Sequence, residues 1–200
     1  NDVALRLDGW PCGNGPCSGM SPFVSNNVIA YNATALRITG SLSNIENNML
    51  FENDGEYLIY QGSINGLNYS TPTFLNNNFH NNQVSYLLNN NEGNVTAINN
   101  WWGTTESDSI SIWVFDGFDD VNAGIVNYEP FLIVPNTDAP PIPAQTVTVT
   151  STGNDFISLK WDTSPLGDLA GYKLYYDSDS SGYPYANSVD IGTDTSYTLS

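Results

Sequence analysis

The chain has 200 residues, with 21 acidic side chains against four Lys and Arg, which gives a formal net charge of −17. Binding of phosphate groups needs clustered basic side chains, so we expect neither nucleic acid nor an anionic membrane as a partner. No stretch approaches the ~18 consecutive apolar residues of a membrane-spanning helix, so no membrane insertion is expected. The first residues show neither an initiator Met nor a leader pattern, which favours a mature or excised piece.

The first motif along the chain is a short turn that contains Gly and Pro between Cys12 and Cys17. It is short enough to be closed by a disulfide, and such a bond would indicate an oxidising, secreted location. A zinc site would need further Cys or His ligands, and the sequence holds a single histidine, His80. We therefore predict a disulfide between Cys12 and Cys17 and no zinc.

The phrase Asn-x-apolar-x-x-Asn recurs at Asn27, Asn48 and Asn77, with a degraded copy that begins at Asn99. A period near 22 residues with short β-like runs and no helical spacing indicates a β-solenoid. Strands of successive repeats would then pair in parallel about 4.8 Å apart. One interior row is predicted to contain Ile29, Leu50, Phe79 and Trp101. The asparagines are expected to take left-handed backbone at corners and to hydrogen-bond along the stack.

The second interval between these phrases is longer than its neighbours, and the excess lies in residues 63–72. Long insertions in solenoids emerge as loops on one face, which is often the binding face. Asn68 and Tyr69 are the candidate ligand-binding residues of this loop. A loop without any binding role is the other interpretation.

After the repeats comes an ordered string of motifs: NNWWGT at 99–104, Ile110, Ile112, DGFDD at 116–120, GIV at 124–126 and YEPFL at 128–132. This string resembles the closing segment of secreted right-handed parallel β-helix repeat proteins, and the resemblance covers residues 24–133. It implies a right-handed solenoid with a C-terminal cap. In such a cap, Trp101 and Trp102 fill the last coil and the following segment folds over the exposed strand edges.

Three carboxylates, those of Asp116, Asp119 and Asp120, lie within five residues. Calcium is a hard cation that takes six to eight oxygen ligands, so this trio is a candidate calcium site. A turn formed by the DGFDD segment explains the same residues without a metal. No other cofactor is expected.

Enzymes that cleave polysaccharides share the β-helix fold, so catalysis needs a separate test. Polysaccharide lyases of this fold need calcium and a basic residue, but the predicted solenoid contains only Arg6 and Arg37, and Arg37 is expected to point outwards from a strand. Hydrolases need two facing carboxylates, and Glu46 and Glu52 do not occupy matching repeat positions. His80 follows an interior position and is expected to point outwards. We predict no catalytic residues, although the question of enzymatic activity stays open.

Residues 135–143 are rich in proline and predict a stiff linker between an all-β domain at 1–134 and a second domain at 144–200. The second domain shows apolar residues with period 2 in five runs, as antiparallel strands do. The runs contain Val147 and Val149; Ile157, Leu159 and Trp161; Tyr172, Leu174 and Tyr176; Val189 and Ile191; Tyr197 and Leu199.

This pattern resembles a fibronectin type III domain, an immunoglobulin-like β-sandwich, but it lacks the last two strands of that family. Either those strands lie outside the sequence or a neighbouring subunit supplies them. Asn-x-Ser/Thr triplets at Asn32, Asn68 and Asn94 are candidate glycosylation sites, of which Asn68 is the most accessible by prediction.

Three functions are consistent with these patterns. The first is a non-enzymatic structural or adhesive module of a larger multidomain protein, secreted or at a cell surface, with other domains of the polypeptide as partners. The second is binding or degradation of polysaccharides on an outer face. The third is a subunit of a self-assembling extracellular filament that contacts neighbouring subunits.

Overall fold

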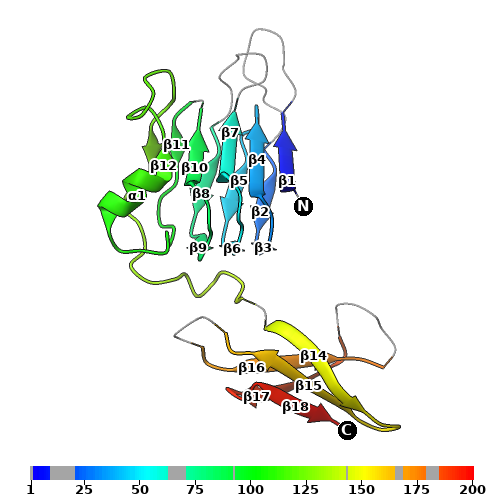
Figure 1. Ribbon diagram of the computed structural model, residues 1–200. Coiled ribbons are helices and arrows are strands. Elements are labelled where there is room, and N and C mark those ends of the chain that lie inside the picture. Colours follow the sequence, from blue (N-terminus) through cyan, green and yellow to red (C-terminus); the bar gives the residue numbers. More distant parts are fainter. Residues whose placement is uncertain are drawn as a thin grey trace. The chain divides into compact units, whose positions relative to one another are not determined.

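The computed structural model describes residues 2–9, 21–62, 71–91, 93–142, 144–164, 169–178 and 185–200. The fold is all-β, with 18 strands and a single helix among these residues. The chain divides into two compact units, Asn1–Pro141 and Ile142–Ser200 (Figure 1). No helix in the described part of the chain is long and apolar enough to cross a membrane.

The first unit contains three parallel sheets, whose strands alternate along the sequence. The first sheet contains, in spatial order, β1 (Val3–Asp8), β4 (Thr34–Thr39), β7 (Tyr57–Gly62), β10 (Tyr86–Asn90) and β12 (Val114–Phe115). The second contains β13 (Val126–Asn127), β11 (Val95–Thr96), β8 (Thr73–Leu75), β5 (Asn44–Glu46) and β2 (Phe23–Ser25). The third contains β3 (Val28–Ala30), β6 (Met49–Phe51) and β9 (Asn78–His80).

Each repeat of the sequence therefore adds one strand to each sheet, and we call such a set of three strands a tier. Tier 1 is β2, β3 and β4; tier 2 is β5, β6 and β7; tier 3 is β8, β9 and β10. β1 lies beyond tier 1 and pairs with β4 alone, whereas β11, β12 and β13 lie beyond tier 3. Figure 1 shows the tiers side by side, with β3, β6 and β9 along one edge.

Equivalent apolar side chains of successive tiers form interior rows. Ile29 pairs with Leu50 and Leu50 with Phe79, and all three are buried, which confirms the predicted row. Complete burial of such a side chain contributes about 1.5–3 kcal/mol. These rows supply the apolar core of the first unit.

The prediction that Trp101 continues this row is wrong by one residue. Trp101 bridges to Asn78, so the next residue, Trp102, extends the row. The Trp102 ring contacts Phe79 edge to face with centroids 4.8 Å apart, and the side chain is 1% exposed. The repeat phrase in the fourth copy therefore begins at Asn100 and not at Asn99.

Two asparagine ladders run along the corners of the tiers. Asn27, Asn48, Asn77 and Asn100 form the first, and Asn32, Asn53 and Asn82 form the second. In the first ladder, the Asn48 amide nitrogen Nδ2 donates to Asn77 Oδ1 at 3.0 Å, and the Asn48 backbone N–H donates to the same oxygen at 3.0 Å. Each inner asparagine thus satisfies buried polar groups of the tier before it.

Left-handed backbone occurs one position before each ladder asparagine, so the two predicted roles of asparagine belong to different residues. The residues at these positions, all with positive φ, are Asn26, Tyr31, Asn47, Glu52, Asn76, Asn81 and Asn99. Five of these seven are asparagine, the non-glycine residue that tolerates this conformation best.

The end of the stack beyond tier 3 is covered by the chain that follows Trp102. Helix α1 (Ser107–Trp113) buries Ile110, and the Tyr128 ring contacts Trp102 edge to face at 6.2 Å. The Leu132 backbone N–H donates to Asn100 O at 3.0 Å, which closes the edge at the corner. The sequence patterns did not predict α1.

Part of the predicted linker is bound to the stack. The Asn136 backbone N–H donates to Asn78 Oδ1 at 2.7 Å, and its Nδ2 donates to Asn76 O at 2.6 Å. Asn136 Nδ2 also donates to Asn47 Oδ1 at 3.0 Å. Residue 136 is therefore fixed to tiers 2 and 3.

The second unit contains two small antiparallel sheets. One is β14 (Gln145–Thr152), β15 (Ile157–Asp162) and β18 (Ser196–Leu199), and the other is β16 (Tyr172–Tyr176) and β17 (Asn187–Gly192). Trp161 is buried and contacts the Tyr172 ring at 5.5 Å. Val147 and Val149 of β14 are each 56% exposed.

Candidate functional site

Four of the predicted site residues cannot be placed. Cys12 and Cys17, the predicted disulfide, and Asn68 and Tyr69, the predicted ligand-binding pair, lie outside the described residues. The disulfide, the loop site and glycosylation of Asn68 remain predictions.

The loop with Asp116, Asp119 and Asp120 is organised by hydrogen bonds from its own backbone. Asp116 is buried, and its carboxylate accepts from Phe118 N–H at 2.9 Å and from Val126 N–H at 2.8 Å. Asp119 Oδ2 accepts from Asp116 N–H at 3.1 Å. The Asn122 backbone N–H donates to the Asp120 carboxylate and, with help from its side-chain amide, lowers the pKa of Asp120.

These bonds use the carboxylates to shape the turn rather than to surround a cation. The described residues contain no group of three His, Cys, Asp or Glu side chains placed to hold a metal ion, these three included. The turn interpretation therefore accounts for the DGFDD segment, and the calcium interpretation has no geometric support.

Two candidate glycosylation sites are described, and they differ in accessibility. Asn32 is 7% exposed, and its Nδ2, the atom that a glycan would modify, donates to Ala30 O at 2.6 Å and to Asn53 Oδ1 at 3.3 Å. This burial argues against a glycan at Asn32. Asn94 is exposed, and its Oδ1 accepts from Ile125 N–H at 2.9 Å.

The two arginines of the stack, Arg6 on β1 and Arg37 on β4, are register partners in the first sheet, whereas His80 lies on a strand of the third sheet. Arg6 is exposed and pairs with Asp8, where Nε donates to Oδ2 at 2.6 Å. His80 is half-buried at the end of β9, and Arg37 is half-buried on β4.

The most prominent surface cluster is a set of aromatic rings on the first sheet. We call it the aromatic row, and it consists of Tyr57, Tyr60, Tyr86 and Phe115 with Arg37 at one end. β7 supplies two of these rings, β10 and β12 supply one each, and β4 supplies the arginine. All five side chains are half-buried, so each packs against its neighbours and keeps part of its surface in solvent.

Strand register brings these rings together. Arg37 pairs with Tyr60, and Tyr57 pairs with Tyr86. Tyr57 and Tyr86 stack with centroids 6.2 Å apart, and the Tyr86 and Phe115 rings meet edge to face at 5.8 Å. The Tyr57 and Tyr60 centroids are 5.7 Å apart. Register thus aligns Arg37 with Tyr60 and Tyr57 with Tyr86, whereas Phe115 is in register with Asn89 and contacts the Tyr86 ring diagonally.

Two electrostatic features distinguish the row. The Arg37 guanidinium carbon lies 5.1 Å from the Tyr60 ring centroid, which is within the range of a cation–π interaction. Arg37 Nε is buried and has no hydrogen-bond acceptor among the described residues. A hydrogen bond between Tyr57 and the Glu56 carboxylate, with burial as a second cause, raises the pKa of Tyr57 to about 12.

Half-exposed rings beside an arginine and a carboxylate form a surface of mixed character. The faces of aromatic rings carry partial negative charge and attract the weakly positive C–H groups of a sugar or an alkyl chain. Tyrosine hydroxyls and the guanidinium supply hydrogen bonds at the edges. The size and mixed character of this surface suit contact with an extended ligand.

Sequence reasoning missed the row, although a signal was present. The runs that begin at Thr34, Tyr57 and Tyr86 pair with one another without any shift. The first residues of the three runs therefore align, and so do the fourth residues. That alignment puts Tyr57 with Tyr86 and Arg37 with Tyr60. The runs were recognised as strands but were not aligned with one another.

Comparison of the chain with protein-family models, with curated proteins and with solved structures gave no match.

Proposed function

We propose that the chain is a non-enzymatic structural and adhesive module of an extracellular or cell-surface protein, and that the aromatic row is its binding surface. In this proposal the first unit is a right-handed parallel β-helix, and the second is a partial fibronectin type III-like domain. Polysaccharide is the proposed ligand class.

Three observations support the β-helix. Each repeat adds one strand to each of three parallel sheets, equivalent apolar residues stack, and asparagines link the tiers. The right-handed sense rests on the resemblance of residues 99–132 to that family. The five strands of the second unit, with β14, β15 and β18 in one sheet and β16 and β17 in the other, agree with the fibronectin type III pattern without its last two strands.

The aromatic row is the observation that carries the binding function. It presents four rings on strands that are held in register by the stack, so little conformational entropy is lost when a ligand binds. A polysaccharide with apolar ring faces and hydroxyl edges matches rings flanked by hydrogen-bonding groups. Acidic sugars would also pair with Arg37, the cation at one end of the row.

A glycan array with the 200-residue chain tests this proposal. Tyr60→Ala removes the ring under Arg37 and should weaken binding about 3- to 10-fold, the value of one aromatic contact. Tyr175→Ala is the matched control, because Tyr175 is an exposed tyrosine of the second unit that also lies beside a cation, Lys173. Equal losses in the two variants, or no binding by the wild-type chain, would contradict the proposal.

Assays for lyase and hydrolase activity on the glycans that bind separate adhesion from degradation. Adhesion predicts unchanged glycan chains after incubation. Turnover by the wild-type chain would favour the polysaccharide-degrading alternative.

The filament alternative is supported by a separate observation in the second unit. Val147, Val149 and Tyr175 are each more than half exposed, and the β16–β17 sheet has two open edges among the described strands. Strands donated by a neighbouring copy would cover such edges. Light scattering as a function of concentration tests this alternative: growth of polymers would support it, and a monomer at all concentrations would exclude it.

A further inference from the structure

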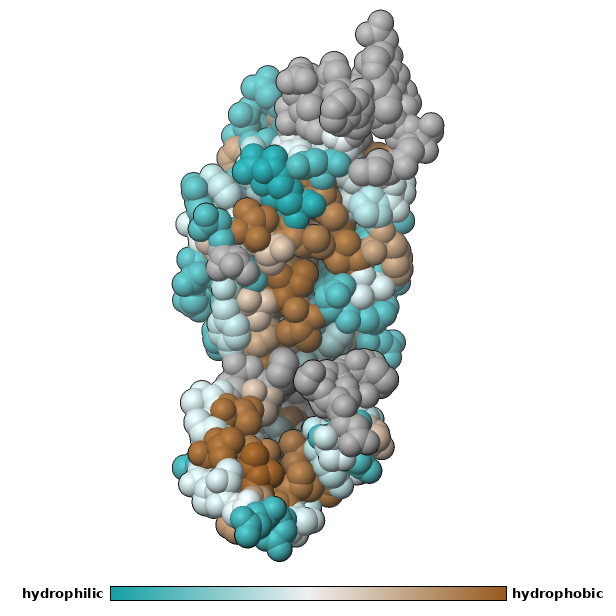
Figure 2. Space-filling view, turned by 90° about the vertical axis from the view of Figure 1, so that its right-hand side faces the viewer, coloured by the Kyte–Doolittle hydropathy of each residue, from teal (hydrophilic) through white to brown (hydrophobic). Residues whose placement is uncertain are grey.

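The two strands β2 and β3 are edge strands, and the described residues leave the end of the stack before tier 1 incompletely covered. Among these residues only β1 lies beyond tier 1, and it extends the first sheet alone. Val24 and Ile29 are 8% and 9% exposed, whereas the residues of tier 2 below them, Ile45 and Leu50, are fully buried. Figure 2 faces this end and shows apolar residues gathered on it.

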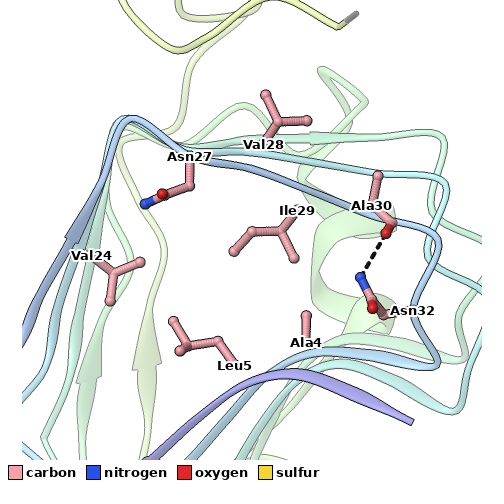
Figure 3. Close-up of a pocket in the computed structure, with 8 residues that line it drawn as sticks. All are labelled: Ala4, Leu5, Val24, Asn27, Val28, Ile29, Ala30 and Asn32. Atoms are coloured by element: carbon pink, nitrogen blue, oxygen red, sulfur yellow. Dashed lines mark hydrogen bonds between the residues drawn. The ribbon is translucent and has the colours of Figure 1, made fainter. Parts of the chain in front are cut away.

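A hollow of about 330 Å³ opens at this end. In Figure 3, Leu5, Val24 and Ile29 point into the hollow from three strands, while Val28 points away from it. Asn27 and Asn32 line the hollow at two corners. The hollow is the cross-section of the interior rows, exposed where the next tier would lie.

The asparagine ladders are also incomplete at this end. In every inner tier, Oδ1 of the ladder asparagine accepts two hydrogen bonds from the asparagine of the tier before it, one from the backbone N–H and one from Nδ2. Asn48 Oδ1, for example, accepts both from Asn27, at 3.0 and 3.1 Å. Asn53 Oδ1 accepts both from Asn32 in the same way, at 3.1 and 3.3 Å. No described residue donates to Oδ1 of Asn27 or of Asn32.

We propose that this end is a docking site for one more polypeptide segment with the phrase Asn-x-apolar-x-x-Asn, which would pair in parallel with β2 and β3. Its two asparagines would donate to Asn27 Oδ1 and Asn32 Oδ1. The two asparagines of the phrase are five positions apart, as Asn27 and Asn32 are. Its apolar residue would cover Ile29. The required chemistry is that of this chain's own tiers, since the vacant positions continue ladders and rows that are already formed.

A second copy of the chain fits this end poorly. The opposite end of the ladder is occupied, because Leu132 N–H donates to Asn100 O and Asn99 N–H donates to Pro130 O. Two copies that met through their open ends would place acceptor Oδ1 atoms against each other. The occupant must bring donors, which the proposed segment does.

The chain offers a graft for the test. Residues 43–56 contain β5 and β6 and lead directly into β7, which begins at Tyr57. Val3 of β1 and Tyr57 of β7 both align with Thr34 of β4, so Val3 is the equivalent of Tyr57 in its own strand. Fusion of a copy of 43–56 directly before Val3 therefore reproduces a native connection. The rest of the chain is unchanged.

We expect the graft to raise Tm by about 4 °C or more, because each kcal/mol corresponds to about 2–4 °C in a chain of this size. It should also slow hydrogen exchange at the amides of β3. The same residues in scrambled order are the matched control and should give no rise. In a chain with Asn27→Ala and Asn32→Ala, the rise should fall by at least half.

Three results would overturn the proposal. One is a graft that leaves Tm unchanged, and another is a scrambled graft that stabilises equally. The third is a concentration-dependent dimer of the ungrafted chain in sedimentation that loses its contact after Asn27→Ala, which would assign the open end to a second copy. None of these results depends on glycan binding, so the proposal stands apart from the function of the aromatic row.

Discussion

The two ends of the stacked unit have different surroundings: β11, β12 and β13 lie beyond tier 3, and β1 is the one described strand beyond tier 1. At the end beyond tier 3, Trp102, α1 and Tyr128 cover the interior row. At the end before tier 1, Ile29 reaches the hollow and Asn27 is exposed. The difference shows that a tier is not complete by itself, because its polar and apolar groups are satisfied only by the tier on each side.

The two ends also differ in the kind of sequence that forms them. The covered end departs from the repeat, with two tryptophans, a helix and the YEPFL segment. Tier 1, at the open end, keeps the repeat phrase that begins at Asn27. A segment that departs from the repeat is thus the signal for a closed end.

The largest expected effect is loss of the ring that closes the covered end. Trp102→Ala removes a fully buried side chain that contacts both Phe79 and Tyr128, and it should lower the free energy of unfolding by about 3–5 kcal/mol. Ile29→Ala, in the same row at the open end, should cost about 2 kcal/mol, since part of its surface already faces solvent. Urea unfolding measures both values, and equal costs would contradict the asymmetry.

The next largest effect concerns the asparagine ladder. Asn77→Ala removes Oδ1, the acceptor for Asn48, and Nδ2, the donor to Asn100 Oδ1 and Ile45 O. Buried groups that lose a partner cost about 1–3 kcal/mol each, so we expect a loss of about 3 kcal/mol.

Asn27→Ala is the matched variant at the open end. It removes Nδ2, which donates to Asn48 Oδ1 and to Ser25 O, while the backbone N–H of residue 27 still donates to Asn48 Oδ1. We expect a loss of about 1 kcal/mol, because the bond to Ser25 O is exposed and water can replace it. A cost as large as that of Asn77→Ala would mean that Asn27 Oδ1 is already satisfied, and the open end would then be closed.

The interior rows could be predicted from the sequence because their spacing is regular. Ile29, Leu50 and Phe79 follow the same asparagine in each repeat, and a parallel register then places them above one another. The prediction for the fourth copy failed because two asparagines and two tryptophans are adjacent there, so two alignments with the repeat phrase fit equally well. The backbone decides between them: Asn99 has φ of 56°, as the residues before the ladder do, and this shifts the row to Trp102.

The aromatic row and the turn at Asp116 show what pattern reasoning lacked. The row depends on the register between β7 and β10. An insertion lies between these two strands in the sequence, so the spacing from Tyr57 to Tyr86 does not follow the repeat period. At Asp116, a run of carboxylates has two physical interpretations, and only the positions of backbone N–H groups distinguish a turn from a metal site. Both features are decided by tertiary contacts.

The smallest expected effect is a pH dependence of β1, the one described strand beyond tier 1. The Asp8 carboxylate accepts hydrogen bonds from the Thr39 hydroxyl and from Arg6 Nε, and these interactions, above all the one with Thr39, lower the pKa of Asp8. A lowered pKa in the folded state stabilises the fold above the unfolded value of about 3.9, and this contribution is lost as the pH falls through the folded value.

Asp8→Asn should therefore lower Tm slightly at pH 7, by about 2 °C or less because the carboxylate is partly exposed and screened by water. The difference from the wild-type chain should shrink to nothing below about pH 3, where the wild-type carboxyl is also protonated. Asp138→Asn, at an exposed acidic position of the same unit, is the matched control for the loss of one negative charge. If the Tm difference for Asp8→Asn stays constant with pH, the introduced amide destabilises the fold for steric reasons. The charge of Asp8 then does not contribute to the pairing of β1 with β4. The open end would then depend only on the pairing of β1 with β4 and on apolar contacts, whereas the covered end keeps its rings and backbone bonds at every pH.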